Sequence, residues 1–262
     1  AISQSGHNYH YLNWIPSEAG PIVTSYGKIA KVINNVEEFN QKHYEVFSEI
    51  KSILNNEEPI FTYSLDINNL IISTCYKDDN NPDLNSWYTM QYKDEKMDNI
   101  MDYYHYPISK GSYQLLSIAI PKIIRESIRK NISLLKAHIN NISTGIFSAE
   151  SGARYWFHAD KLTNYLIWKV GKKKNDEILY INNNQLEGYF SITRNIKKIK
   201  INWQFGNSDA IQLIYKYIES LINKDSNIQK PIEKIFLYTC EEKEEDVKNF
   251  VKKNIENIAL IN

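Results

Sequence analysis

The chain has 262 residues, of which 42% are hydrophobic and 24% are charged, a composition typical of a globular protein with a substantial core. Its 31 Lys and Arg residues balance its 31 Asp and Glu residues, so no net charge attracts nucleic acid. No apolar run approaches the length of about 18 residues that a membrane span needs, so we expect no transmembrane helix and no signal peptide.

The two cysteines, Cys75 and Cys240, lie far apart in apolar, strand-like runs. They form no CxxC motif and no Cys/His spacing of the kind that binds zinc. We therefore expect buried, reduced thiols and no structural zinc site.

Strand-like and helix-like patterns alternate along the first half of the chain. The best-defined helix is predicted over residues 121–139, because its apolar residues recur at helical spacing and Pro121 suits a first turn. The apolar positions of this helix are Ile124, Ile128, Ile132, Leu135 and Ile139. The other predicted elements are two or three strands within 1–33, a helix at 37–54, strands at 60–63 and 70–76, a helix at 87–104 and a strand at 114–120.

The second half begins with the apolar run 144–147 and a helix of small residues. Residues 207–209 are predicted to cap the helix 210–222. Strands are expected at 164–170, 177–181, 185–192, 198–205, 232–240 and 258–261, with a further helix at 242–254. The halves share a coarse strand and helix order, which predicts an α/β fold with mixed sheets and two domains, 1–142 and 143–262.

Five segments of the chain carry a resemblance to a known superfamily. They are the opening 2–6 with its following strands, 117–121 before a helix, 145–153, 166–171 with the hairpin that ends at Phe190, and 235–240. In order and spacing more than in identity, they resemble the superfamily of actin, sugar kinases and heat-shock chaperone ATPases. Within it they look most like the PilM-like branch of type IV pilus and secretion assemblies. The resemblance spans nearly the whole chain and implies two tandem ribonuclease-H-like subdomains.

The chain departs from the superfamily in its three loop motifs. The first two loops of the family carry Asp-x-Gly, whereas residues 4–6 read Gln-Ser-Gly and residues 169–171 read Lys-Val-Gly. The third carries Gly-Gly, whereas residues 239–240 read Thr-Cys. In the family the aspartates hold Mg²⁺ and its waters, and the glycines allow the backbone to approach phosphate. Both carboxylates are therefore missing here.

The resemblance implies three candidate phosphate-loop positions, Gly6, Lys169 and Gly171. Lys169 would repel Mg²⁺ but could attract a phosphate directly. Two acidic residues on nearby loops, Asp176 and Asp209, are possible substitutes for the missing carboxylates. We predict no catalytic residue, no metal ligand and no cofactor, and the alternative is a site that binds ATP and Mg²⁺.

Two local features have both a structural and a functional interpretation. In the segment 148–153 we interpret Ser148 as a helix cap rather than a nucleophile, and Gly152 and Ala153 as small residues that permit close packing of the halves. The bulky aromatic residues Trp168 and 155–157 are interpreted as core rather than as a ligand-stacking platform.

The resemblance implies a non-catalytic actin-like scaffold or assembly protein of a pilus-like or secretion system. Its expected partners are proteins, among them a membrane-anchored assembly component, and its expected location is the cytoplasm or the inner-membrane periphery. The alternative is an ATP-binding ATPase or kinase with an atypical site. A ribonuclease-H-like nuclease is disfavoured, because two-metal chemistry needs carboxylates on central strands and residues 2–15 contain none.

Overall fold

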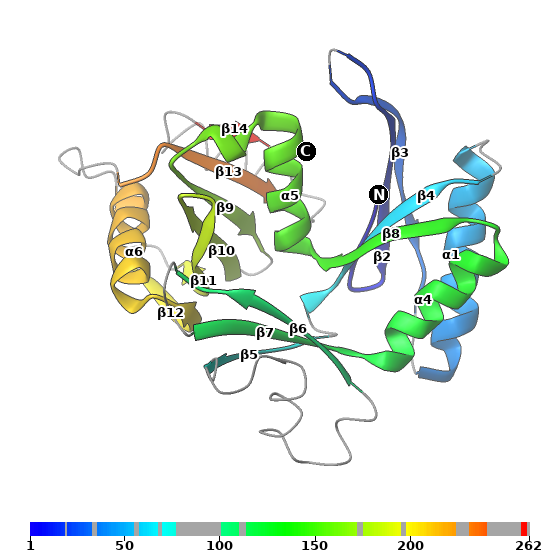
Figure 1. Cartoon of the computed structure of the whole chain (residues 1–262), viewed down its shortest axis with the longest axis horizontal. Coiled ribbons are helices and arrows are strands. Elements are labelled where there is room, and N and C mark those ends of the chain that lie inside the picture. The colour runs from blue at the N-terminus through cyan, green and yellow to red at the C-terminus, as the bar shows by residue number, and fades with distance from the viewer. Residues whose placement is uncertain are drawn as a thin grey trace. The chain divides into compact units, whose positions relative to one another are not determined.

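The computed structural model has the predicted α/β architecture with mixed sheets (Figure 1). It describes residues 1–18, 20–32, 36–54, 58–67, 70–76, 101–109, 114–171, 175–194, 198–223, 231–239 and 258–260. The predicted helix 242–254 and Cys240 lie outside the described residues, as does most of the predicted helix 87–104. Among the described helices, none is long and apolar enough to cross a membrane.

The chain forms two compact units, and each is described by itself. The first unit includes Ala1–Ile71 and Ile118–Ser148, and the second includes the chain from Ala149 onward, together with residues 72–76, 105–109 and 114–117. The predicted domain boundary near Ile142 stays a prediction.

The first unit is built on a mixed five-stranded sheet with the order β3-β2-β1-β4-β8. The first three strands are antiparallel, whereas β1, β4 and β8 run parallel. The predicted strands and the helix at 37–54 are therefore confirmed. The bounds are β1 Ile2–Ser5, β2 Asn8–Ile15, β3 Ile22–Ala30, α1 Val36–Leu54, β4 Ile60–Leu65, α4 Lys122–Leu134 and β8 His138–Thr144.

An aromatic core lies between this sheet and α1. His43 and Phe47 of α1 are fully buried, and the Phe47 ring lies 5.7 Å from Tyr63 and 6.2 Å from Phe61, centroid to centroid. Tyr63 and Phe61 share one face of β4 because side chains alternate along a strand. Figure 1 shows α4 beside α1, where the Asn131 side chain donates to the Asn40 carbonyl at 2.9 Å.

The helix predicted over 121–139 is α4, but it ends earlier than predicted. It stops at Leu134, and Lys136 then takes a φ of 52° in the left-handed region. Ile139 belongs to β8, where it pairs with Phe61 of β4. The apolar spacing continued past the true helix end because Ile139 is a partly buried residue of β8, where the apolar side chain serves the sheet and not the helix.

Between β4 and α4 the chain forms a three-stranded sheet with the order β5-β7-β6. β7 is almost wholly buried, as its continuous apolar run predicted, and Cys75 of β5 is buried as expected. The predicted helix 87–104 is wrong over residues 101–104, because Met101 begins a strand. The bounds are β5 Ile71–Tyr76, β6 Met101–Pro107 and β7 Gln114–Pro121.

The second unit contains a six-stranded mixed sheet with the order β12-β11-β10-β9-β13-β14. Strands β9 to β12 are antiparallel neighbours, and β13 runs parallel to β9. All of the predicted strands of this half are present. The bounds are α5 Gly145–Phe157, the 3₁₀ helix η2 Ala159–Lys161, β9 Asn164–Val170, β10 Asn175–Asn182, β11 Gln185–Arg194, β12 Ile199–Gly206, α6 Ser208–Asn223, β13 Lys234–Thr239 and β14 Ile258–Leu260.

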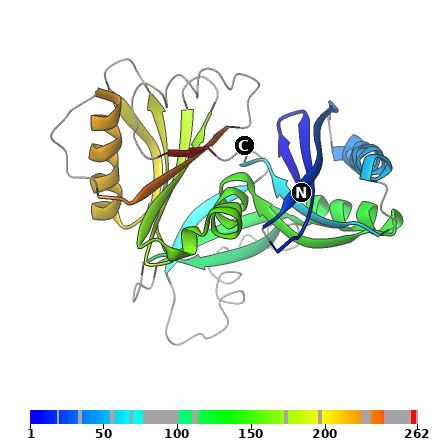
Figure 2. The same cartoon turned by 90° about the horizontal axis from the view of Figure 1, so that it is seen from above.

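Helix α6, drawn in orange in Figure 2, covers one face of this sheet. Asn207 caps it as predicted, because its side-chain oxygen accepts from the backbone N–H groups of Asp209 and Ala210 at 3.0 and 3.2 Å. The core under α6 contains Leu166, Trp168, Ile178, Phe190, Ile192, Ile211, Ile214, Ile218 and Leu237.

One prediction about the segment 148–153 is wrong, because Ser148 lies inside α5, which begins at Gly145, and does not cap that helix. A Cβ atom on Gly152 would meet no atom within 4 Å, and Ala153 is fully buried. The predicted close packing of the halves at these two residues stays a prediction.

Candidate functional site

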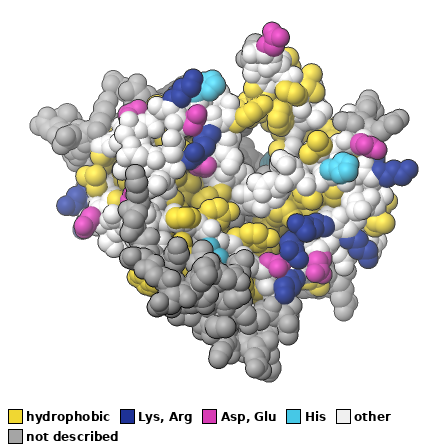
Figure 3. Space-filling model, in the orientation of Figure 1, with side chains coloured by type: hydrophobic (Ala, Val, Ile, Leu, Met, Phe, Trp, Pro, Cys, Tyr) yellow, Lys and Arg dark blue, Asp and Glu magenta, His cyan; other side chains and the backbone are white. Residues whose placement is uncertain are grey.

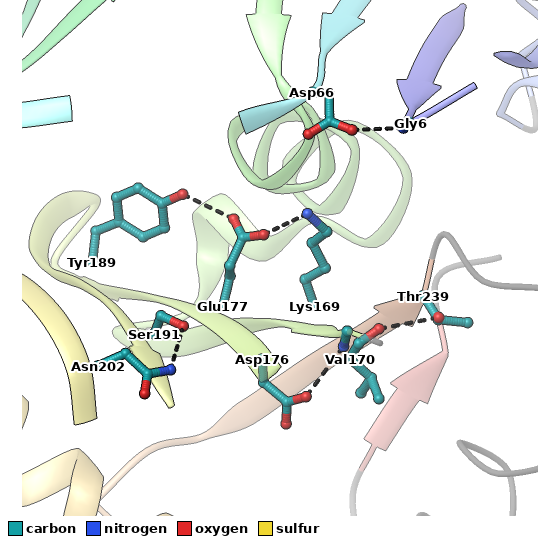
Figure 4. A network of polar contacts seen from close by, with 11 residues as sticks. Gly6, Asp66, Lys169, Val170, Asp176, Glu177, Tyr189, Ser191, Asn202 and Thr239 are labelled. Carbon is teal, nitrogen blue, oxygen red and sulfur yellow. Dashed lines mark hydrogen bonds and ion pairs between the residues drawn. The ribbon is translucent and has the colours of Figure 1, made fainter. Parts of the chain in front are cut away.

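The first candidate loop is the tight turn between β1 and β2. Gly6 opens the turn with a φ of +56°, in the left-handed region that glycine adopts most easily. Its backbone N–H donates to the Oδ2 atom of Asp66 at 2.6 Å (Figure 4). The amide of the loop is therefore already bound to a carboxylate of the same chain.

The parallel pairing of β1 and β4 brings Gly6 and Asp66 together. Ile2 pairs with Tyr63 and Ser3 with Ser64, so both strands end at the same edge of the sheet. Gly6 follows β1 and Asp66 follows β4. In open α/β sheets, ligands bind outside the carboxyl ends of the strands, and this pair occupies such a position.

Gln4, which resembles the first aspartate of the family, is part of the core. It is 9% exposed, and its Oε1 atom accepts from the Tyr63 hydroxyl at 3.2 Å. The same hydroxyl lies 3.4 Å from Nε2 of His43. Burial lowers the pKa of His43 to about 3, so this histidine is neutral. Gln4 thus anchors a neutral polar cluster under α1.

Lys169, which resembles the second aspartate, is bound by a carboxylate. Its Nζ atom lies 2.5 Å from Oε1 of Glu177, its register partner on β10. The other oxygen of Glu177 accepts from the Tyr189 hydroxyl at 2.9 Å (Figure 4). Burial, together with the Glu177 charge, raises the pKa of Tyr189 well above its usual value. The ammonium group of Lys169 is therefore already in an ion pair with a residue of the same sheet.

Gly171 is required by the path of its own loop. A Cβ atom there would lie 1.8 Å from the carbonyl oxygen of Asn175. The Gly171 N–H donates to Oδ1 of Asp176 at 3.1 Å. The glycine therefore accommodates the returning backbone, and its amide is bound to a carboxylate.

Asp176 is a fully buried carboxylate with several donors. It accepts from the Trp168 indole N–H at 2.8 Å, and Nε of Arg194 lies 2.6 Å from the same oxygen. Burial raises the pKa of Asp176, and the charge of Arg194 acts in the opposite direction. Its oxygens therefore already have partners within the chain.

The remaining sequence-predicted positions form no metal centre. Asp209 is exposed in the first turn of α6. The Thr239 hydroxyl donates to the Val170 carbonyl at 3.1 Å, joining β13 to β9. Within the described part of the chain, no group of three or more His, Cys, Asp or Glu side chains could hold a metal ion.

The aromatic residues divide between core and surface. Trp168 is fully buried, which confirms its predicted role in the core. Tyr155 is 52% exposed and Phe157 is 38% exposed, so the prediction that they are core residues is wrong.

The sequence prediction did not identify Asp66 and Glu177 as partners of the candidate groups. Asp66 had one usable signal, because it directly follows a strand-like run and such positions gather at the edge of a parallel sheet. Glu177 had the weaker signal of an acid that follows a lysine across a short hairpin.

No protein-family model and no curated protein matches the sequence. Among solved structures, the chain is similar to a PilM-PilN type IV pilus biogenesis complex at 9% identity and a TM-score of 0.53, covering 100% of this chain and 87% of that one. It is also similar to the cytoplasmic domain of EpsL from Vibrio cholerae, at 11% identity, 99% and 84% coverage and a TM-score of 0.48. A Bacteroides thetaiotaomicron protein with an actin-like ATPase fold matches at 10% identity, 99% and 89% coverage and a TM-score of 0.46. The likeness to the PilM-PilN structure shows the fold alone: the chain has the actin-like ATPase fold, and at that level it resembles the PilM-like branch.

Proposed function

We propose that the chain is a non-catalytic actin-like scaffold that acts by binding partner proteins. One observation carries this proposal. Each of the three candidate phosphate-loop groups is bound by a carboxylate of the same chain: Gly6 by Asp66, Gly171 by Asp176 and Lys169 by Glu177. An incoming phosphate would have to displace these carboxylates and would meet their negative charge.

The metal requirement supports the same conclusion. Mg²⁺ prefers carboxylate and water oxygens in a near-octahedral arrangement. The two positions that resemble the metal-holding aspartates are Gln4, which is packed in the core, and Lys169, which is cationic. Neither supplies the negative charge that would hold Mg²⁺ beside a nucleotide, so we propose that the protein uses no cofactor.

A protein partner is supported by an exposed apolar surface. The projecting β2–β3 hairpin carries Ile15, Ile22, Val23 and Tyr26, which are each at least 41% exposed (Figure 3). Exposed apolar groups gathered on one element are typical of interaction sites. The similar PilM structure is a complex with a second protein. We therefore propose a pilus-like or secretion assembly, with a membrane-anchored component among the partners and a location in the cytoplasm or at the inner-membrane periphery.

Titration of the purified protein with Mg-ATP in a calorimeter, followed by an assay of phosphate release, tests the non-catalytic part. We expect no binding heat, no release and no increase in thermal midpoint, because a ligand that binds only the folded state would raise it. Tight Mg²⁺-dependent binding with turnover that is lost in the Asp209→Asn variant would instead establish an enzyme.

Co-purification with the proteins encoded beside it tests the scaffold part. The Tyr26→Lys variant should weaken the interaction, because it places a charge on the apolar hairpin. The matched control is Lys28→Gln, which changes the charge of the same strand away from the hairpin tip. Equal binding by all three proteins would show that the hairpin is not the contact.

A further inference from the structure

We propose that Asp66 is an internal substitute for a bound phosphate, an autoinhibitory contact that keeps the Gly6 loop closed to anions. This deepens the proposed function, on which it rests, because it names the group that occupies the first loop. A carboxylate oxygen and a phosphate oxygen are equivalent acceptors for a backbone N–H, and such charge-assisted bonds are short. The distance of 2.6 Å from the Gly6 nitrogen to Oδ2 of Asp66 fits this description.

The first loop could open, whereas the second could not. A Cβ atom on Gly6 would meet no atom within 4 Å, so no other residue crowds this side of the glycine. At Gly171 the same test finds the Asn175 carbonyl oxygen at 1.8 Å. The acceptor at the second loop, Asp176, is fully buried and is held by Trp168. Asp66 is only partly buried, so its side chain can be removed with less disruption of the core.

Loss of the Asp66 carboxylate would therefore leave an exposed donor at the carboxyl edge of a parallel sheet. That edge is where open α/β sheets bind ligands. The chemical class that fits is a phosphate oxyanion, either as free inorganic phosphate or as a phosphate ester. We infer that the wild-type protein excludes this class at Gly6 and that the Asp66→Ala variant admits it.

The test follows the Gly6 amide by ¹⁵N NMR while inorganic phosphate is added at constant ionic strength. In the wild-type protein the Gly6 shift should move no more than that of Gly20, a turn glycine whose N–H donates to Ser17. In the Asp66→Ala variant the Gly6 shift should move several-fold more and should saturate. The Glu126→Ala variant removes an exposed acid elsewhere in the first unit and should behave as the wild type.

One further variant keeps the proposal testable if Asp66→Ala folds poorly. The Asp66→Asn variant keeps an oxygen acceptor but loses the charge, so its Gly6 response should fall between those of the wild type and Asp66→Ala. A Gly6 response in Asp66→Asn no larger than that in the wild type would overturn the proposal.

Two more results would overturn it. One is a Gly6 response to phosphate in the wild-type protein equal to that in Asp66→Ala. The other is a response in Asp66→Ala no larger than that of Gly20. A second titration series with Mg-ATP distinguishes a phosphate ester from free phosphate. Turnover of ATP by the wild-type protein with an unmoved Gly6 amide would reject the scaffold function while leaving the role of Asp66 intact.

Discussion

Trp168 donates its indole N–H to the Asp176 carboxylate at 2.8 Å, and both side chains are completely buried. The Gly171 amide donates to the other oxygen of this carboxylate, and Arg194 forms an ion pair with the same carboxylate. Removing one member of a buried ion pair is strongly destabilising, because the charge of the other member is left buried without a partner. The pair therefore fixes the start of β10 against β9 and β11, and it ties the second candidate loop to the core.

The Asp176→Asn variant should lose about 3–5 kcal/mol of unfolding free energy, because it leaves Arg194 without its ionic partner. It also places an amide N–H₂ where either Trp168 or Gly171 needs an acceptor, because these two groups donate to different oxygens of Asp176. Urea unfolding at neutral pH measures the change. The control is Asp160→Asn, which alters an exposed acid and should change the free energy by less than about 0.5 kcal/mol. Equal stability of the two variants would show that the network around Asp176 contributes little.

The Ile128→Ala variant should lose about 2–5 kcal/mol, because Ile128 on α4 is 0% exposed and truncation leaves a cavity. The same helix offers a matched control in Ile123, which is 48% exposed. Ile123→Ala should change the unfolding free energy by less than about 0.5 kcal/mol. Thermal midpoints that fall equally in the two variants would contradict the assignment of the buried face.

The buried face of α4 was predicted well from the sequence, because apolar residues at helical spacing mark the face of a helix that packs against the core. The sequence could not predict where α4 ends, because the break at Lys136 uses a left-handed residue without a glycine or proline to mark it. It also placed Met101 in a helix, although this residue begins β6. Apolar residues in that region fit either period, and only pairing with a neighbouring strand decides between them.

The sequence predicted the loop glycines of the candidate site but not the residues that contact them. Gly6 lies in a turn, as its sequence context indicated, and Gly171 directly follows β9. The acceptor for Gly6, however, lies 60 residues away in sequence and reaches it only through the parallel pairing of β1 with β4. The strand-like run before Asp66 indicated a position at a sheet edge, but local patterns do not specify which strands pair. The core role of Gln4 was hidden for the same reason, since it depends on Tyr63.

Stability should fall in acid because of His43. Burial lowers its pKa to about 3, against an ordinary value near 6.5 in the unfolded chain. Between these values the unfolded state binds a proton that the folded state does not, so the free energy of unfolding decreases as pH decreases. His43 should lower the free energy of unfolding by about 1.4 kcal/mol for each pH unit of acidification within this window. Above the window His43 should have no effect on the pH dependence of stability.

Urea unfolding of the wild type and the His43→Gln variant from neutral to acid pH isolates this contribution. The variant cannot titrate at this position, so its stability should depend less steeply on pH. His138→Gln, which changes an exposed histidine, should keep the wild-type slope. Equal pH dependence of the unfolding free energy in the wild type and His43→Gln would show that His43 binds a proton equally in the folded and unfolded states.

Two glycines should respond to alanine with opposite signs. Gly171→Ala should cost at least about 2–3 kcal/mol, because its Cβ atom would overlap the backbone oxygen of Asn175, which no side-chain rotation can relieve. Gly152 lies within α5, and a Cβ atom there meets nothing within 4 Å. Gly152→Ala should therefore stabilise the protein by about 0.5–1 kcal/mol, because alanine loses less backbone entropy in a helix.

Thermal unfolding of the wild type and both variants, with and without Mg-ATP, shows whether glycine is required at position 171 by the backbone or by a bound ligand. If this glycine is kept for the loop path alone, the loss in Gly171→Ala should be the same in both conditions, because no bound nucleotide contributes to stability. A wild-type protein that is stabilised by Mg-ATP, beside a Gly171→Ala variant that is not, would show that the glycine admits a phosphate. Such a result would contradict the explanation that the Asn175 carbonyl alone requires glycine at this position.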